Sequence, residues 1–225
     1  ALAIVAVAPI LMYLGFRKIS LPTTISTPQN QTQARQPLPG LFWVFWATII
    51  LAVSAEFCIV FWSADYLENV LRLAKADATQ AVSFFFVGMV LGRMAGSRLA
   101  QRFSAPHVVT ASVLVASIGF LAFWQARIAA LGLGGLLVIG LGIANLYPLL
   151  LSLTLGTASN NTVQASARAT LASGVAILTL PLVLGRLADA VGIGLAFGVV
   201  MLLLAGIFLI IQIAGRVSPA QERMA

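Results

Sequence analysis

Long apolar stretches alternate with short polar segments along most of the chain. Between residues 40 and 215 there are six such stretches, at 41–63, 78–96, 107–125, 129–155, 169–187 and 192–214. A helix needs about 20 apolar residues to cross the hydrocarbon core of a bilayer. The strands of a membrane barrel would instead alternate apolar and polar residues, which these stretches do not. The pattern predicts an all-α integral membrane protein with six membrane-spanning helices.

The two ends of the chain differ from this central region. Residues 1–16 are apolar and are followed by Arg17 and Lys18, whereas a signal peptide carries its positive charge before the apolar run. We therefore expect residues 1–16 to be the end of a transmembrane helix from an N-terminal half that this sequence lacks. Residues 17–39 are rich in Pro, Ser, Thr and Gln, which predicts a cytoplasmic linker. A six-span bundle at 40–215 and a cytoplasmic tail at 216–225 complete the expected organisation.

Composition supports the membrane assignment and narrows the partners. Hydrophobic residues make up 60% of the chain and charged residues 8%, against roughly 25% charged residues in soluble proteins. The net charge of +7 does not indicate a nucleic-acid partner, because the basic residues are interleaved with the spans and form no basic domain. With one Cys and one His, the chain has no metal-ligand cluster and no cofactor motif. The expected surroundings are the lipid bilayer.

The Lys and Arg residues are distributed unevenly between the two sides of the predicted spans. If the 17–39 linker is inside, nine of them fall on the inner side and four on the outer side. By the positive-inside rule, the linker and the C-terminal tail are then cytoplasmic, and the protein is a multi-pass component of the cell (inner or plasma) membrane.

The tetrapeptide Val-Leu-Gly-Arg occurs at 90–93 and again at 183–186. Each copy closes the middle span of a group of three. Because three spans are an odd number, the second group is inverted, which places Arg93 at the cytoplasmic side and Arg186 at the outer side. Inverted three-helix repeats are a known transporter architecture. We expect Arg93 and Arg186 to stabilise opposite gates, with Asp189 beside Arg186 on the same helix face.

The first copy lies within a row of glycines spaced by four residues: Gly88, Gly92 and Gly96. Four residues are about one helical turn, so the glycines share a face on which another helix can approach closely. Arg98 and Arg102 follow, and we expect both in a cytoplasmic loop. A plain helix end, with arginines snorkelling to the membrane interface, is the alternative.

With this repeat and span count, the chain resembles the C-terminal half of a major facilitator superfamily transporter over essentially its whole length. The family's loop signature is close to G-x-L-A-D-R-x-G after Gly-Arg. Here Gly92-Arg93 precedes SRLAQRFS at 97–104, which matches the Leu, Ala and Arg, while Gln101 replaces the Asp. The outer copy, GRLADAVG at 185–192, begins with Gly185 and Arg186 and keeps the Asp as Asp189. The resemblance implies a six-helix bundle whose first and fourth spans line a central cavity.

Glu56 lies about two-thirds of the way along the first span. An ionisable group at that depth is costly and usually faces a cavity or a partner. It is therefore a candidate for proton titration or cation binding. A structural carboxylate that hydrogen-bonds a neighbouring helix is the alternative.

The fourth span contains the second candidate group. Asn145, Tyr147 and Pro148 lie near its middle, and Gly135, Gly142, Asn145, Ser152 and Gly156 are spaced so that they would share one helix face. Proline is tolerated at this depth where the freed carbonyl lines a cavity or meets a neighbouring helix. We expect Asn145, Tyr147 and Ser152 to contact substrate, with helix packing around a kink as the alternative. Trp62, near the outer end of the first span, belongs either to an interfacial aromatic belt or to the mouth of the cavity.

These features favour a secondary active transporter that moves a small organic solute by alternating access, coupled to protons through Glu56. The alternatives are a non-transporting membrane scaffold and a membrane-embedded enzyme. An enzyme needs convergent nucleophile, base or metal groups, and a single His with six acidic residues argues against it.

Overall fold

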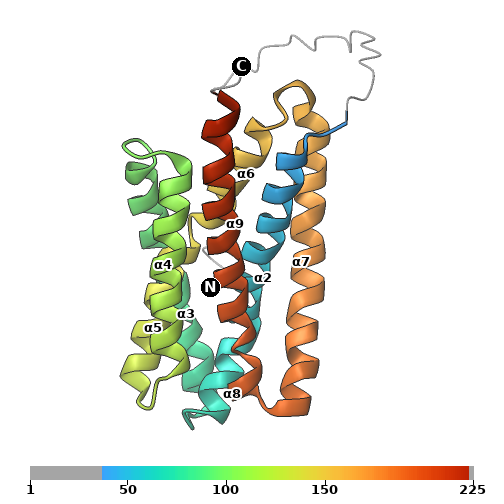
Figure 1. Cartoon of the computed structure of the whole chain (residues 1–225). Coiled ribbons are helices and arrows are strands. Elements are labelled where there is room, and N and C mark those ends of the chain that lie inside the picture. Colours follow the sequence, from blue (N-terminus) through green and yellow to red (C-terminus); the bar gives the residue numbers. More distant parts are fainter. Residues whose placement is uncertain (1–36, 223–225) are drawn as a thin grey trace, which may run out of the picture. The chain divides into compact units, whose positions relative to one another are not determined.

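The computed structural model describes residues 37–222, without the side chains of Asn160 and of residues 216–222, and this part is a bundle of long helices (Figure 1). The first three spans are α2 (Gly40–Asn69), α3 (Lys75–Leu99) and α4 (Ala105–Trp124). The fourth is divided into α5 (Ala129–Ile143) and α6 (Leu146–Gly156). After the short turn η1 (Ser159–Asn161) come α7 (Thr162–Val191), α8 (Ile193–Ala196) and α9 (Val199–Glu222).

Within residues 37–222, six helical segments are long and apolar enough to cross a membrane, which confirms the six predicted spans. The first 36 residues, which include the predicted end of a preceding helix and most of the predicted linker, lie outside the described residues. The division at 16, 39 and 215 therefore stays a prediction.

The helices extend beyond the apolar stretches that predicted them. α2 continues through Asp65 and Glu68 to Asn69, and α7 begins at Thr162, ahead of its apolar stretch. A helix satisfies its backbone hydrogen bonds whatever its side chains are, so polarity alone does not end it. For the same reason Arg98, expected in the loop, lies in the last turn of α3, where a positive charge is favourable to the helix dipole.

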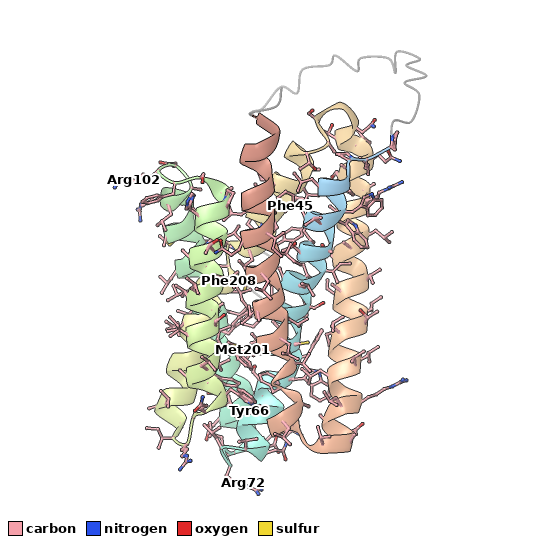
Figure 2. All side chains as sticks on the ribbon, in the orientation of Figure 1. Phe45, Tyr66, Arg72, Arg102, Met201 and Phe208 are labelled. Carbon is pink, nitrogen blue, oxygen red and sulfur yellow. The ribbon has the colours of Figure 1, made fainter. Side chains whose placement is uncertain are left out.

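Arg102 and Arg72 mark opposite ends of the bundle (Figure 2). We call the end with Arg102 the inner end and the end with Arg72 the outer end, following the charge distribution. α3 runs toward the inner end and α7 runs away from it (Figure 1). The two Val-Leu-Gly-Arg copies therefore lie near opposite ends of the bundle, on helices of opposite direction.

Glycines let α5 pack closely between α3 and α4. A Cβ atom on Gly88 would collide with the Leu137 carbonyl oxygen, and one on Gly92 would lie 2.5 Å from the Leu141 carbonyl oxygen. In return, Gly140 of α5 leaves no room for a Cβ against the Phe85 carbonyl. The predicted contact face of Gly88, Gly92 and Gly96 is confirmed, and its partner is the fourth span.

The fourth span is interrupted at Ala144 and Asn145, between α5 and α6. Pro148 lies in the first turn of α6, where its missing N–H costs no helical hydrogen bond. The interruption corrects the expectation of one shared face along this span. A Cβ on Gly135 would lie 2.7 Å from Phe123 of α4, whereas Asn145 lies against Gly96 of α3.

An aromatic cluster fills the outer end of the core. Tyr66 of α2 lies with its ring centroid 4.9 Å from that of Phe123 and 5.2 Å from that of Phe197. The Tyr66 hydroxyl donates a hydrogen bond to the Trp124 carbonyl oxygen at 2.5 Å. This cluster joins α2, α4 and the α8–α9 turn, so the outer ends of three spans are held together by buried rings.

Candidate functional site

Glu56 lies within α2 and is half-buried. Arg93 of α3 is exposed, and its guanidinium acts electrostatically on the Glu56 carboxylate. No direct ion pair joins the two within the described part of the chain. The structure thus brings together two residues that the sequence singled out separately. An acid with a nearby but unbonded counter-charge can exchange protons or accept a ligand without first breaking a salt bridge.

Asn145 joins the interruption of the fourth span to α3. Its side-chain amide nitrogen donates a hydrogen bond to the Gly92 carbonyl oxygen at 2.8 Å. The same side chain occupies the space where a Cβ of Gly96 would be. At least one donor of Asn145 is therefore used between helices of this bundle, and the sequence did not predict that use.

Trp62 makes a contact of the same kind between α2 and α7. Its indole N–H donates a hydrogen bond to the Pro181 carbonyl oxygen at 2.9 Å. The ring lies over Gly185, where a Cβ would be 2.7 Å from its Cζ2 atom. Gly185 of the outer Val-Leu-Gly-Arg copy thus receives the Trp62 ring, much as Gly96 receives Asn145.

A third contact follows the same rule at the outer end. The Trp124 indole N–H donates to the Gly194 carbonyl oxygen at 2.7 Å, and the ring lies over Gly198. In all three contacts the acceptor is the carbonyl of residue i, and residue i+4 is glycine. Within α3 and α7, a carbonyl has a second lone pair beyond the one that bonds the N–H of residue i+4. In the third contact the Gly198 N–H bonds the Leu195 carbonyl oxygen, which leaves the Gly194 carbonyl oxygen to Trp124. A glycine at i+4 leaves room for an outside donor to reach the carbonyl.

The inner end of α2 is bound to α7 by two further tryptophans. The Trp46 indole N–H donates to the Arg168 carbonyl oxygen at 2.9 Å. The Arg168 guanidinium carbon lies 5.1 Å from the ring centroid of Trp43, a cation–π contact. An interfacial aromatic belt accounts for the depth of Trp43 and Trp46 in the membrane. It does not account for their contacts with Arg168, which depend on the packing of α2 on α7.

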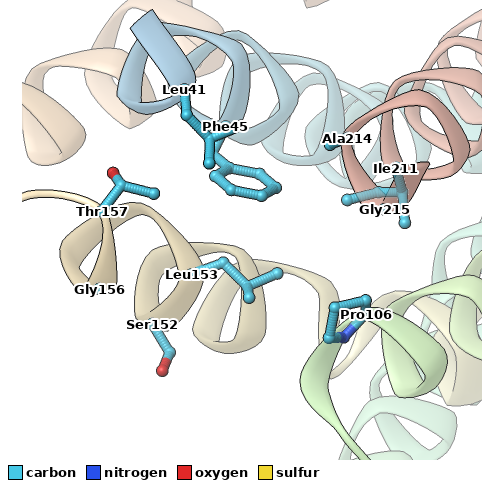
Figure 3. A pocket seen from close by; sticks show the side chains of 10 residues that line it. All are labelled: Leu41, Phe45, Pro106, Ser152, Leu153, Gly156, Thr157, Ile211, Ala214 and Gly215. Atoms are coloured by element: carbon cyan, nitrogen blue, oxygen red, sulfur yellow. The ribbon is translucent and has the colours of Figure 1, made fainter. Parts of the chain in front are cut away.

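A cavity of about 280 Å³ lies near the inner end, between α2, α4, α6 and α9 (Figure 3). Its walls are mainly apolar, with Phe45, Leu153 and Ile211 among them. Of the residues predicted to contact substrate, Ser152 belongs to this lining, and in Figure 3 its hydroxyl points away from Phe45. Tyr147 is half-buried against the core and Pro148 is exposed. The predicted contact residues are thus spread along the bundle and do not meet in this cavity.

The remaining predicted residues lie at the two ends of the bundle. Arg186 and Asp189 are both exposed at the outer end of α7, and no ion pair joins them in the described structure. Arg98 and Arg102 are exposed at the inner end. The described residues contain no group of three or more His, Cys, Asp or Glu side chains that would hold a metal ion.

Comparison with known proteins gives homologues among membrane transporters. The chain is 32% identical over 161 residues to a glucose/galactose transporter of Brucella abortus, an alignment covering 66% of this chain and 36% of that protein. It is 27% identical over 168 residues to an MFS-type transporter of Yersinia pestis (72% and 43%), and 30% identical over 149 residues to the membrane protein MosC of Rhizobium meliloti (65% and 36%). The alignments span less than half the length of these relatives. No protein-family model matches the chain.

Solved structures show the same fold. The chain superposes on FucP, a major facilitator superfamily transporter in its outward conformation, with a TM-score of 0.74 and 19% identity, over 94% of this chain and 53% of FucP. It superposes on the POT family transporter PepTSo with a TM-score of 0.71 and 15% identity, over 80% of this chain and 38% of PepTSo. Among the relatives by sequence, those from Brucella abortus and Yersinia pestis are transporters. The described residues therefore have the six-helix fold of one half of a major facilitator superfamily transporter, and the chain is similar in sequence to part of an MFS-type transporter and of a glucose/galactose transporter.

Proposed function

We propose that this chain is the C-terminal half of a secondary active transporter that moves a small organic solute by alternating access and is coupled to protons. The single observation that carries the coupling is Glu56, a half-buried acid within a membrane span, with the Arg93 guanidinium acting on it and no direct ion pair. Intramembrane acids are costly and mark ion or substrate pathways. In this proposal the partner is an N-terminal six-helix half, and the two halves rock around a shared site.

The proposed pathway combines Glu56 with Tyr147, Pro148 and Ser152 of α6. Asn145 and Trp62 belong to it as supports, since both hold neighbouring helices in place. Few charges lie within the spans, which favours a weakly charged or neutral solute. Two relatives from Brucella are glucose/galactose transporters, so hexoses are the first solutes to test.

The proton coupling is tested with Glu56→Gln in the full-length protein, reconstituted in liposomes with labelled glucose or galactose. Gln keeps the size and hydrogen-bonding capacity of Glu but does not titrate. We expect accumulation driven by a pH gradient to be lost, while exchange of labelled for unlabelled solute continues. Glu68→Gln, at the outer end of the same helix, is the matched control and should accumulate solute normally.

The outcomes separate coupling from a structural role. If Glu56→Gln lowers expression and thermal stability, and exchange falls together with accumulation, Glu56 is structural. If Glu56→Gln accumulates solute at the wild-type ratio, the coupling role is wrong. If no hexose is exchanged, a wider screen of neutral solutes is needed before the coupling experiment can be read.

The proposed location is the cell membrane, with the C-terminal tail in the cytoplasm. The excess of Lys and Arg at one end of the spans supports this orientation. A protease-sensitive epitope added after residue 225 tests it, since the epitope should resist external protease in intact cells and be cleaved in inside-out vesicles.

A further inference from the structure

An open hollow of about 440 Å³ lies at the inner end of the bundle, where α3 passes into the α3–α4 loop. It is lined by Arg98, Leu99, Gln101, Arg102 and Phe103. All five side chains are exposed, and Phe103 keeps 59% of its surface accessible. Arg102 extends from the end of the bundle in Figure 2. Two guanidinium groups and two apolar side chains therefore share one surface depression.

The acids whose side chains the structure describes do not neutralise these arginines. Of the six acidic residues, four lie in segments at the outer end, at 65, 68, 77 and 189, and Glu56 lies within a span, where the Arg93 charge acts on it. The sixth, Glu222, follows in the last turn of α9. Arg168 is stacked on Trp43. Within the described side chains, Arg98 and Arg102 form no salt bridge.

An apolar stripe on α3 leads from the membrane-spanning region to Arg98. Val87, Leu91, Met94 and Arg98 follow one another at intervals of four, three and four residues, so they lie on one helix face. The three apolar members are about half exposed, at 50%, 47% and 56%. This face is distinct from that of Gly88, Gly92 and Gly96, which α5 covers. Arg93, near Glu56, lies about 140° around the helix from Arg98 at roughly 100° per residue.

We propose that this hollow binds the phosphate headgroup of an anionic phospholipid, with Arg98 and Arg102 as its ligands and the Val87–Leu91–Met94 stripe as the track for an acyl chain. Guanidinium groups bind phosphate oxygens in bidentate fashion. Basic pockets at the ends of membrane helices attract anionic headgroups. A free phosphate would use the two arginines alone, whereas a lipid also covers the exposed Leu99, Phe103 and the stripe. The apolar surroundings therefore favour a lipid.

The test uses the full-length protein in detergent, with native mass spectrometry to titrate bound palmitoyl-oleoyl phosphatidylglycerol against palmitoyl-oleoyl phosphatidylcholine. We expect tighter binding of the anionic lipid. Arg98→Gln/Arg102→Gln should weaken it by about 25-fold, since each arginine near a membrane surface contributes about a factor of five. The control Arg72→Gln/Arg127→Gln removes the same charge from the outer end. It should change binding less than about threefold, because neither arginine lines the hollow and surface electrostatic attraction falls off within a Debye length.

Further variants distinguish a lipid headgroup from free phosphate and keep the proposal testable if the glutamine variant does not fold. Arg98→Lys/Arg102→Lys keeps the charge but loses the bidentate geometry, so its affinity for the anionic lipid should lie between that of the wild type and that expected for the glutamine variant. It serves as the test if the glutamine variant does not fold. Met94→Gln should weaken binding of the anionic lipid and leave the competition by inorganic phosphate unchanged. Equal binding of the two lipids, equal loss in the inner and outer variants, or inorganic phosphate binding as tightly as the lipid would each overturn the proposal.

Discussion

The side-chain amide of Asn145 donates a hydrogen bond to the backbone carbonyl of Gly92, at 2.8 Å. This bond joins the interruption between α5 and α6 to the Val-Leu-Gly-Arg copy on α3. It is possible because Gly96, one turn further along α3, has no Cβ where the Asn145 side chain lies. The residue that we expected to contact substrate thus also supports the inner half of the bundle.

Replacing Gly96 with Ala should displace the Asn145 side chain. A Cβ at this position collides with the carboxamide group of Asn145, so the hydrogen bond to Gly92 is lost and the local packing is strained. We expect a loss of about 1–3 kcal/mol in unfolding free energy, measured by thermal unfolding in detergent. Gly134→Ala, which meets no atom within 4 Å, is the control and should be neutral.

The contact between Gly96 and Asn145 is specific if the two substitutions are coupled. Asn145→Ala removes the side chain with which the new Cβ collides. Gly96→Ala/Asn145→Ala should therefore be less destabilised than the sum of the two single variants. Additive losses would mean that Gly96 is restricted by something other than Asn145.

Gly185→Ala should disturb Trp62 in the same manner at the outer half of the bundle. The new Cβ would lie 2.7 Å from Cζ2 of the indole ring, so the ring must move and its hydrogen bond to Pro181 weakens. We expect about 1–3 kcal/mol of destabilisation. Gly174→Ala, on the same helix with no atom within 4 Å, is the matched control. Trp62→Phe keeps a ring but loses the donor, and should lower the free energy of unfolding by about 1 kcal/mol. If it lowers stability as much as Gly185→Ala, the contact depends on the hydrogen bond and not on the fit of the ring against Gly185.

Cys58 should not react with thiol reagents while the protein is folded. It is the one cysteine of the chain, and its side chain is fully buried within α2. Maleimide labelling should appear only after denaturation. Cys58→Ala/Val163→Cys moves the thiol to a position that is 84% exposed and should label at once. Rapid labelling of native Cys58 would mean that α2 separates from its neighbours during the working cycle.

Arg93 and Arg186 remain our candidates for opposite gates. Arg93→Ala should shift the full-length protein toward its inward-open state, because it removes a charge that acts near the inner end. Arg186→Ala should shift it toward the outward-open state. Cysteine accessibility measured separately on the two faces of the membrane, in a Cys58→Ala background, distinguishes the two. Shifts in the same direction for both variants would contradict opposite gates.

The features that were predicted from sequence depend on period and on placement. Six apolar stretches of sufficient length predicted six spans, and the spacing of Gly88, Gly92 and Gly96 predicted a close helix contact, because small residues at one-turn intervals let helix backbones approach closely. The sequence could not identify α5 as the partner, since the residues on that side, such as Leu137 and Leu141, contribute backbone atoms to the contact.

The features that were missed depend on side chains that bond to a backbone far away in the chain. Trp62 and Pro181 are 119 residues apart, and Asn145 and Gly92 are 53 apart. A backbone carbonyl acceptor has no sequence signature. From the sequence, Trp62 near a span end was therefore assigned to the membrane interface or the cavity mouth, and Asn145 within a span was assigned to substrate binding. For these two acceptors the one available sign was the glycine four residues later. The Arg168 carbonyl, which accepts from Trp46, is followed at that distance by Ala172.

That spacing has a consequence for how this family of sequences can change. Where an outside donor reaches a helix carbonyl beside a glycine, the donor and the glycine are under selection together. A lineage that loses Trp62 is free to gain a side chain at Gly185, and the same holds for Asn145 with Gly96 and for Trp124 with Gly198. Among homologues of this chain, these three pairs of positions should therefore be replaced together more often than either member is replaced alone.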